Sequence, residues 1–74
     1  MLIQIPGSIA HVESSEVVGV NMSNFDCTEF RVFMKNASHV DSSTKVGTLD
    51  ENKAIANARL FAFVKAVNEA NSNE

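Results

Sequence analysis

The sequence has few of the residues that cross-link small domains. It contains one cysteine, Cys27, among 74 residues, so an intrachain disulfide is excluded. The two histidines, His11 and His39, are far apart in the chain and form no recognised metal-ligand spacing with Cys27. We therefore expect neither a metal nor a cofactor. A chain of this length buries only a small core, and by elimination the sequence predicts stabilisation by self-association.

Runs of basic charge and of apolar residues are also absent. The sequence has six basic and nine acidic residues, for a net charge of −3. It contains no cluster of basic residues that could bind a phosphate backbone, so we expect no nucleic-acid partner. No stretch approaches the roughly 18 apolar residues of a membrane span, and no signal sequence is expected. These absences predict one soluble, cytoplasmic domain over residues 1–74 with no membrane contact.

Catalytic motifs are missing as well. The sequence has no glycine-rich phosphate-binding loop, no HExxH and no GxSxG. Cys27 follows Asp26, whose negative charge disfavours a nucleophilic thiolate, so we expect a partly buried structural cysteine. We expect His11 to be a hydrogen-bonded strand residue and His39 to be solvated near a turn. The sequence therefore predicts a protein that is not an enzyme.

In the N-terminal half of the sequence, short apolar segments predict β-strands. Short apolar strands are expected at Leu2–Ile5 and Ile9–Val12, separated by the turn pair Pro6-Gly7. Val17–Met22 is rich in β-branched valine, and strict alternation would place Val18, Val20 and Met22 on one face. Gly19 inside this strand suggests a bulge or a close backbone approach.

The second half of the sheet is more regular. Thr28–Lys35 alternates cleanly and presents one apolar face, made of Phe30, Val32 and Met34. A return strand is expected to begin at His39, to be interrupted by polar residues 41–43 and to resume over 44–48. The fold class is therefore α+β, with an antiparallel meander of about four strands over residues 2–48.

One C-terminal helix is predicted over residues 50–70, followed by a frayed polar tail at 71–74. Asp50 is a candidate N-cap, and Thr48 with Glu51 offers an alternative capping box. At 100° per residue the large apolar side chains gather on one face, which we expect to pack on the sheet. These residues are Ala56, Leu60, Phe63, Val64 and Val67.

The back of this helix is small and apolar. Alanine recurs every four residues at Ala54, Ala58, Ala62, Ala66 and Ala70, with Phe61 at the border. Such a ridge lets a second helix approach closely, which predicts a homo-oligomer of two or more chains. The predicted interface comprises Ala54, Ala58, Phe61, Ala62 and Ala66. The alternative interpretation is that alanine is simply the best helix former and needs no partner.

A hydroxyl-rich segment is the best candidate for binding a small anion. The candidate residues are Arg31, Lys35, Ser42, Ser43, Thr44 and Lys45. Hydroxyls and cations can hold a phosphate, but the segment lacks the glycines of a phosphate-binding loop. The alternative is an ordinary hairpin tip.

Three stretches together carry a family resemblance: Ile5–Val12, Phe30–Lys35 and the helix entry Val46–Glu51. In this order they resemble small bacterial and phage-encoded sheet-plus-helix proteins of the FlbD-like type. The resemblance implies a phage or mobile-element origin and an interaction role, and it assigns no functional residue.

We therefore expect a self-associating binding protein, an accessory factor of a phage that inhibits or modulates a host defence protein. Two alternatives stay open. One is an oligomeric sponge for a small phosphorylated nucleotide, and the other is a small structural or virion component.

Overall fold

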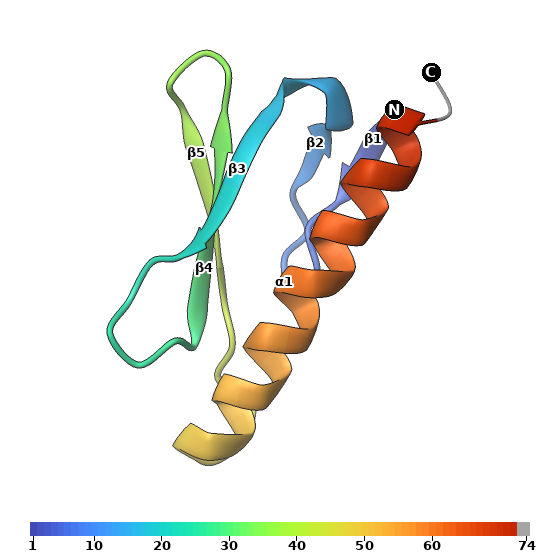
Figure 1. Ribbon diagram of the computed structural model, residues 1–74. Coiled ribbons are helices and arrows are strands. Elements are labelled where there is room, and N and C mark those ends of the chain that lie inside the picture. The colour runs from blue at the N-terminus through green and yellow to red at the C-terminus, as the bar shows by residue number, and fades with distance from the viewer. Residues whose placement is uncertain (73–74) are drawn as a thin grey trace.

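The structure is a computed structural model that describes residues 1–72, and this part of the chain contains five strands and one long helix (Figure 1). The strands are β1 (Leu2–Gln4), β2 (His11–Glu13), β3 (Val17–Met22), β4 (Glu29–Met34) and β5 (His39–Ser43). A short 3₁₀ turn, η1 (Ser14–Glu16), joins β2 to β3, and the helix α1 spans Leu49–Ser72. The predicted α+β class with a C-terminal helix is confirmed.

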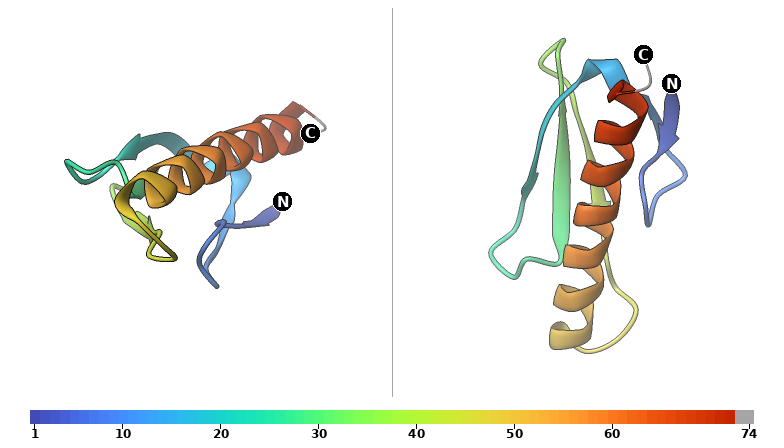
Figure 2. Two further views of the ribbon diagram at one scale, coloured as in Figure 1. Left: turned by 90° about the horizontal axis from the view of Figure 1, so that it is seen from below. Right: turned by 45° about the vertical axis from the view of Figure 1, so that its right-hand side comes forward.

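The strands form two antiparallel sheets where one meander was expected. β1 pairs with β2, and β3, β4 and β5 form a second sheet in that order. The turn η1 separates them, because its 3₁₀ geometry ends β2 and redirects the chain before β3 begins. Figure 2 shows α1 lying over the junction, with the three-stranded sheet on one side and the β1–β2 hairpin on the other. The helix therefore covers both sheets at once.

β3 contains the bulge that Gly19 suggested. The register with β4 shifts between Val17 and Gly19, so Val18 is an extra residue on this strand. One extra residue interrupts the alternation of side chains. Val18 consequently points away from α1 and is 62% exposed, whereas Val17 and Val20 face the helix. The expectation that Val18 shares a face with Val20 and Met22 is wrong for this reason.

The last strand also differs from the prediction. Asp41 pairs with Arg31 and Ser43 with Glu29, so residues 41–43 lie in β5 and are not a hairpin tip. The β4–β5 hairpin turn lies at residues 35–38, and residues 44–48 form an irregular link to α1 where strand was expected. A polar segment is tolerated in this strand because alternation turns only Ser42 inward, where its hydroxyl donates a hydrogen bond to the Pro6 carbonyl at 2.6 Å.

The core sits between α1 and both sheets. Its buried members are Ile5, Val12, Phe30, Val32, Phe63 and Val67. The predicted inward face of β4 is confirmed, and so is the inward face of the helix, where Ala56 is also buried and Leu60 and Val64 are half-buried. In β4 and α1, one apolar face is thus enough to predict which side is buried.

The helix begins with the capping box. Thr48 Oγ1 accepts a hydrogen bond from the Glu51 N–H at 3.2 Å, and Glu51 Oε1 accepts one from the Thr48 N–H at 3.3 Å. Asn52 Oδ1 also accepts from the N–H groups of residues 46 and 47, each at 3.0 Å. Asp50 is therefore inside the first turn and is not the N-cap. Its charge still suits the positive end of the helix dipole.

At its other end α1 extends two residues beyond the predicted limit. Asn71 Nδ2 donates to the Ser14 carbonyl at 3.3 Å, which ties the last turn to η1. Residues 71 and 72 are helical where a frayed tail was expected. The rest of the predicted tail, residues 73–74, lies outside the described residues. No helix within residues 1–72 has the length and apolarity needed to cross a membrane.

Candidate functional site

The back of α1 presents an apolar surface, which we call the outer helix face. It consists of Ala54, Ala58, Phe61 and Ala62, all exposed. Phe61 is 64% exposed, although a phenylalanine ring gains much from burial. None of the four residues is charged. This surface has the composition of a protein-contact patch and no group that could perform chemistry.

The alanine ridge does not stay on the outside for its whole length. Ala66 is half-buried and Ala70 is only 4% exposed, so Ala70 belongs to the core. Four residues turn a helix by about 400°, so each step along the ridge rotates it by roughly 40°. Over four steps the ridge therefore winds from the solvent side into the core. The predicted interface is accessible at four of its five positions and partly covered at Ala66.

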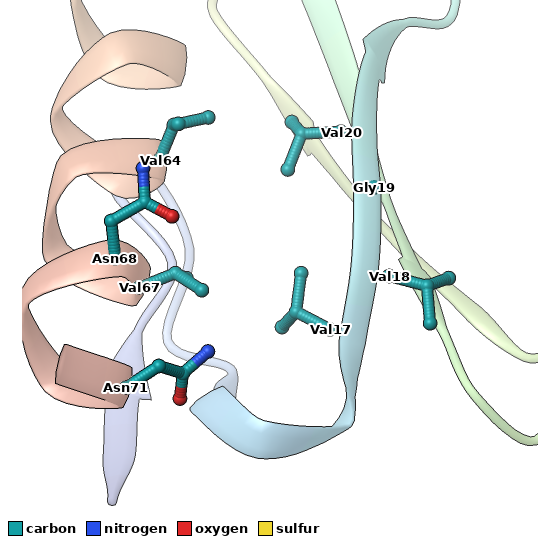
Figure 3. Close-up of a pocket in the computed structure, with 8 residues that line it drawn as sticks. All are labelled: Val17, Val18, Gly19, Val20, Val64, Val67, Asn68 and Asn71. Carbon is teal, nitrogen blue, oxygen red and sulfur yellow. The ribbon is translucent and has the colours of Figure 1, made fainter. Parts of the chain in front are cut away.

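A groove of about 350 Å³ separates α1 from β3 (Figure 3). It is lined by Val17, Val18, Gly19, Val20, Val64, Val67, Asn68 and Asn71. In Figure 3 Val17 and Val20 of the strand point toward Val64 and Val67 of the helix. The lining contains no charged residue. Such a groove suits an apolar side chain, with two asparagine amides at its rim.

The strand beside this groove has an open edge. β3 is the outermost strand of its sheet, and the Ser23 N–H donates to the Glu29 carbonyl at 2.8 Å. Antiparallel pairs alternate between hydrogen-bonded and non-hydrogen-bonded, so the pairs of Val20 and Met22 with β4 are the non-bonded kind. Their N–H and C=O groups therefore point away from β4. Within residues 1–72 no other segment bonds to them.

The structure does not bring the six anion-binding candidates together. Arg31 lies on the outer face of the sheet, where its Nε and Nη2 donate to the two Asp41 carboxylate oxygens at 2.7 and 3.2 Å. These hydrogen bonds and the positive charge of Arg31 lower the pKa of Asp41, and the same bonds and the negative charge of Asp41 raise the pKa of Arg31. The charge of Arg31 is thus already matched within the chain.

The other candidates diverge because they alternate along β5. Ser42 and Thr44 are each 1% exposed and point inward, whereas Ser43 and Lys45 are exposed. Lys35 follows the end of β4 that pairs with His39, so it lies at the opposite end of the strand from Thr44. Sequence proximity therefore does not translate into a shared site here.

Sequence reasoning missed Arg59, which meets this segment from α1. Arg59 Nη1 donates to Thr44 Oγ1 at 3.1 Å. The same nitrogen lies 2.6 Å from where a Cβ on Gly7 would stand, and Gly7 has a φ of +81°. Two features could have indicated this contact: a glycine after Pro6, and a single basic residue on the flank of the apolar helix face. Arg59 thereby ties the helix to the segment after β5 and lies close to the β1–β2 turn.

The remaining polar candidates are separate from one another. Cys27 is exposed with a φ of 56°, and its thiol lies 3.8 Å from the Phe25 carbonyl, so the expected partial burial is wrong. His11 Nδ1 is 3.1 Å from the Ile9 carbonyl, and His39 is exposed, as expected for both. No group of three metal-ligating side chains gathers within residues 1–72.

Comparison with family models, with curated proteins and with solved structures finds no match to this chain. Its function must therefore be argued from the two apolar surfaces just described, the outer helix face and the groove beside β3.

Proposed function

We propose that this chain is a non-enzymatic binding protein that associates with copies of itself through the outer helix face. The observation that carries the proposal is the exposure of Phe61, at 64%, among exposed alanines. A phenylalanine buries roughly 150–250 Å² when it is covered. The neighbouring alanines leave space for a second helix at an axial distance of about 8–10 Å. Covering this face removes an apolar surface from water and enlarges a small core.

The absence of charge on the outer helix face supports a copy of the chain as the partner. The chain carries a net charge of −3, so two copies repel weakly at long range. Lys65 follows one turn after Phe61 on the same side of the helix, and its Nζ lies 3.9 Å from Glu69 Oε1. The four residues of the outer helix face therefore place no charge of their own against a second copy.

A host protein as a further partner, and with it a phage origin, stays a prediction. An assembled surface could present the exposed sheet face to such a partner. The nucleotide-sponge alternative has no geometric support in one chain, because Arg31 is paired and Ser42 and Thr44 face inward. A structural role would differ by producing much larger assemblies at low concentration.

The proposal is tested by the mass of the protein in solution. Ala62→Glu places a carboxylate in the middle of the outer helix face, and should lower the weight-average mass in sedimentation equilibrium. His39→Glu adds the same side chain at an exposed position of β5, and should leave the mass unchanged. A wild type with the mass of one chain at all concentrations would contradict the proposal.

A further inference from the structure

We propose that the open edge of β3 is a second contact between copies, in which two β3 strands pair antiparallel about a two-fold axis at Asn21. This inference deepens the proposed self-association, and it rests on that function only in taking the partner to be another copy. The pairing joins two three-stranded sheets into one of six strands. It uses a different surface from the outer helix face, so the two contacts can be tested separately.

The backbone of β3 offers a matching set of groups. Val20 and Met22 direct their N–H and C=O groups outward, and nothing within residues 1–72 bonds to them. With the axis at Asn21, Val20 of one copy lies opposite Met22 of the other, and the reverse. Each of these two pairs is then of the hydrogen-bonded kind and exchanges two N–H···O bonds. All outward groups of this short segment are satisfied by the same segment of the other copy.

The bulge at Val18 selects this register. Bulges twist and interrupt an edge, and they are one of the devices that prevent unwanted strand pairing. In β3 the bulge affects only the half of the strand before Val20. The loop from Ser23 to Asp26 ends the strand on the other side. Only residues 20–22 remain for pairing, and an odd number of residues places one of them, Asn21, on the axis.

The chemistry of the edge favours a copy of this chain over a charged partner. β3 contains no charged residue, and neither does the lining of the groove beside it. Edge strands are commonly protected by lysine or proline, and β3 has neither. Across the axis the two Asn21 side chains lie opposite each other on the outer face. Their amides contain both donors and acceptors, so they can bond to each other.

The groove gives the added strand an apolar seat. Val20 and Met22 are half-buried and turn their side chains to the helix side of the sheet. Met22 of the other copy, lying opposite Val20, therefore points to the same side and into the groove between β3 and α1. Methionine is flexible and fills irregular space well. A pairing of three residues is short, so we expect it to be populated at high protein concentration.

The test uses charge at the axis, in an Ala62→Glu background that removes the helix contact. Asn21 is exposed and lies opposite Arg31, so Asn21→Glu is compatible with the fold of one chain. In the dimer, however, the two introduced carboxylates face each other. Asn21→Lys creates the same repulsion with opposite sign. Circular dichroism and a urea titration establish that each variant is folded before its mass is measured.

We expect Ala62→Glu alone to form dimers at several hundred micromolar. Adding either Asn21→Glu or Asn21→Lys should reduce the mass to that of one chain, 8.0 kDa. An equimolar mixture of the two double variants should restore the dimer, because residue 21 of one copy then meets the opposite charge on the other. Restoration in the mixture requires residue 21 to face residue 21.

Two results would overturn this inference. In the first, Ala62→Glu is monomeric at these concentrations while the wild type is a dimer; the proposed function then stands and the β3 contact is refuted. In the second, Ala62→Glu remains a dimer but is unaffected by charge at residue 21, so the contact lies elsewhere. A monomeric wild type, by contrast, would refute both the proposed function and the β3 pairing.

Discussion

The two edge strands of the three-stranded sheet, β3 and β5, differ in what their side chains contact. At the β5 edge, Ser42 donates to the Pro6 carbonyl at 2.6 Å and Arg59 donates to Thr44 at 3.1 Å. Both hydroxyl residues are 1% exposed. At the β3 edge, a groove of about 350 Å³ remains and Val18 is 62% exposed. Side chains beside β5 thus bond to the β1–β2 turn and to α1, whereas an apolar groove remains beside β3. The outward backbone groups of both edge strands have no partner within residues 1–72.

This difference follows from the length of the chain. Within residues 1–72, one helix and one extra hairpin are available to cover the three-stranded sheet. The hairpin lies on the β5 side of α1, away from β3, in Figure 2. Unpaired strand edges invite pairing with other chains. The apolar groove distinguishes the β3 side from the β5 side, so variants on the two sides should behave differently.

The largest contrast is expected between two phenylalanines of the same helix. Phe63 is 1% exposed and Phe61 is 64% exposed. Phe63→Ala should lower the free energy of unfolding by about 3–5 kcal/mol through lost burial and a cavity. Phe61→Ala should change it by no more than about 0.5 kcal/mol at a concentration where the protein is monomeric. Urea titrations measure both, and equal effects would contradict the assignment of the two helix faces.

A second contrast compares one glycine on each side. Gly7 has a φ of +81°, and a Cβ there would stand 2.6 Å from Arg59 Nη1. Gly7→Ala should cost about 1–3 kcal/mol of unfolding free energy, from backbone strain and the displaced guanidinium. A Cβ on Gly19 would meet nothing within 4 Å, so Gly19→Ala should be neutral or slightly stabilising. A destabilised Gly19→Ala would contradict the open space around Gly19 on the β3 side.

Neighbouring serines of β5 give a third comparison. Ser42→Ala leaves the Pro6 carbonyl without its partner in a buried place, which should cost about 1–2 kcal/mol. Ser43→Ala alters an exposed side chain and should have little effect. Thermal unfolding distinguishes the two variants. A melting temperature that falls as much for Ser43→Ala as for Ser42→Ala would contradict a stabilising hydrogen bond from Ser42 to Pro6.

The smallest effect concerns the exposed ion pair on the outer sheet face. Arg31 hydrogen bonds lower the pKa of Asp41 below the usual 3.8. The ion pair therefore stabilises the fold fully above about pH 3.8, the usual pKa of an aspartate. This stabilisation is lost as the pH falls through the lower pKa that Asp41 has in the folded protein. Both side chains are 35% exposed, so solvent and salt weaken the effect. Asp41→Asn should have a lower free energy of unfolding than wild type near neutral pH, and this difference should shrink as the pH falls. A difference that does not depend on pH would contradict a contribution from the ionised Asp41 carboxylate.

Local patterns account for how well the elements were predicted. The alternation of Phe30, Val32 and Met34 predicts the buried face of β4, and the 3.6-residue period predicts the buried face of α1. The bulge is different, because Gly19 suggests that one exists but not which side chain it turns outward. Residues 41–43 are all polar, and this composition predicts a turn. They form a strand because the inward hydroxyl of Ser42 bonds to the Pro6 carbonyl, a contact that the local sequence does not reveal.

The candidate sites were harder to predict, because they depend on contacts between distant segments. The alanine ridge is real in the sequence, but its rotation around the helix carries Ala70 into the core. Arg59, Thr44 and Gly7 come from three separate elements, and no spacing in the sequence relates them. Likewise, the open edge of β3 depends on where the β1–β2 hairpin lies. A periodic pattern within one element can be read directly, but an edge without neighbours can be recognised only in the folded molecule.

The most direct test of this account is the mass of the wild-type protein in sedimentation equilibrium from a few micromolar to several hundred micromolar. The outer helix face and the open edge of β3 together predict dimers at the low end and a further increase in mass toward the high end. The mass should therefore exceed twice the 8.0 kDa of a single chain as concentration rises. A constant mass of 8.0 kDa over the whole range would contradict the claim that the outer helix face and the β3 edge bind copies of this chain.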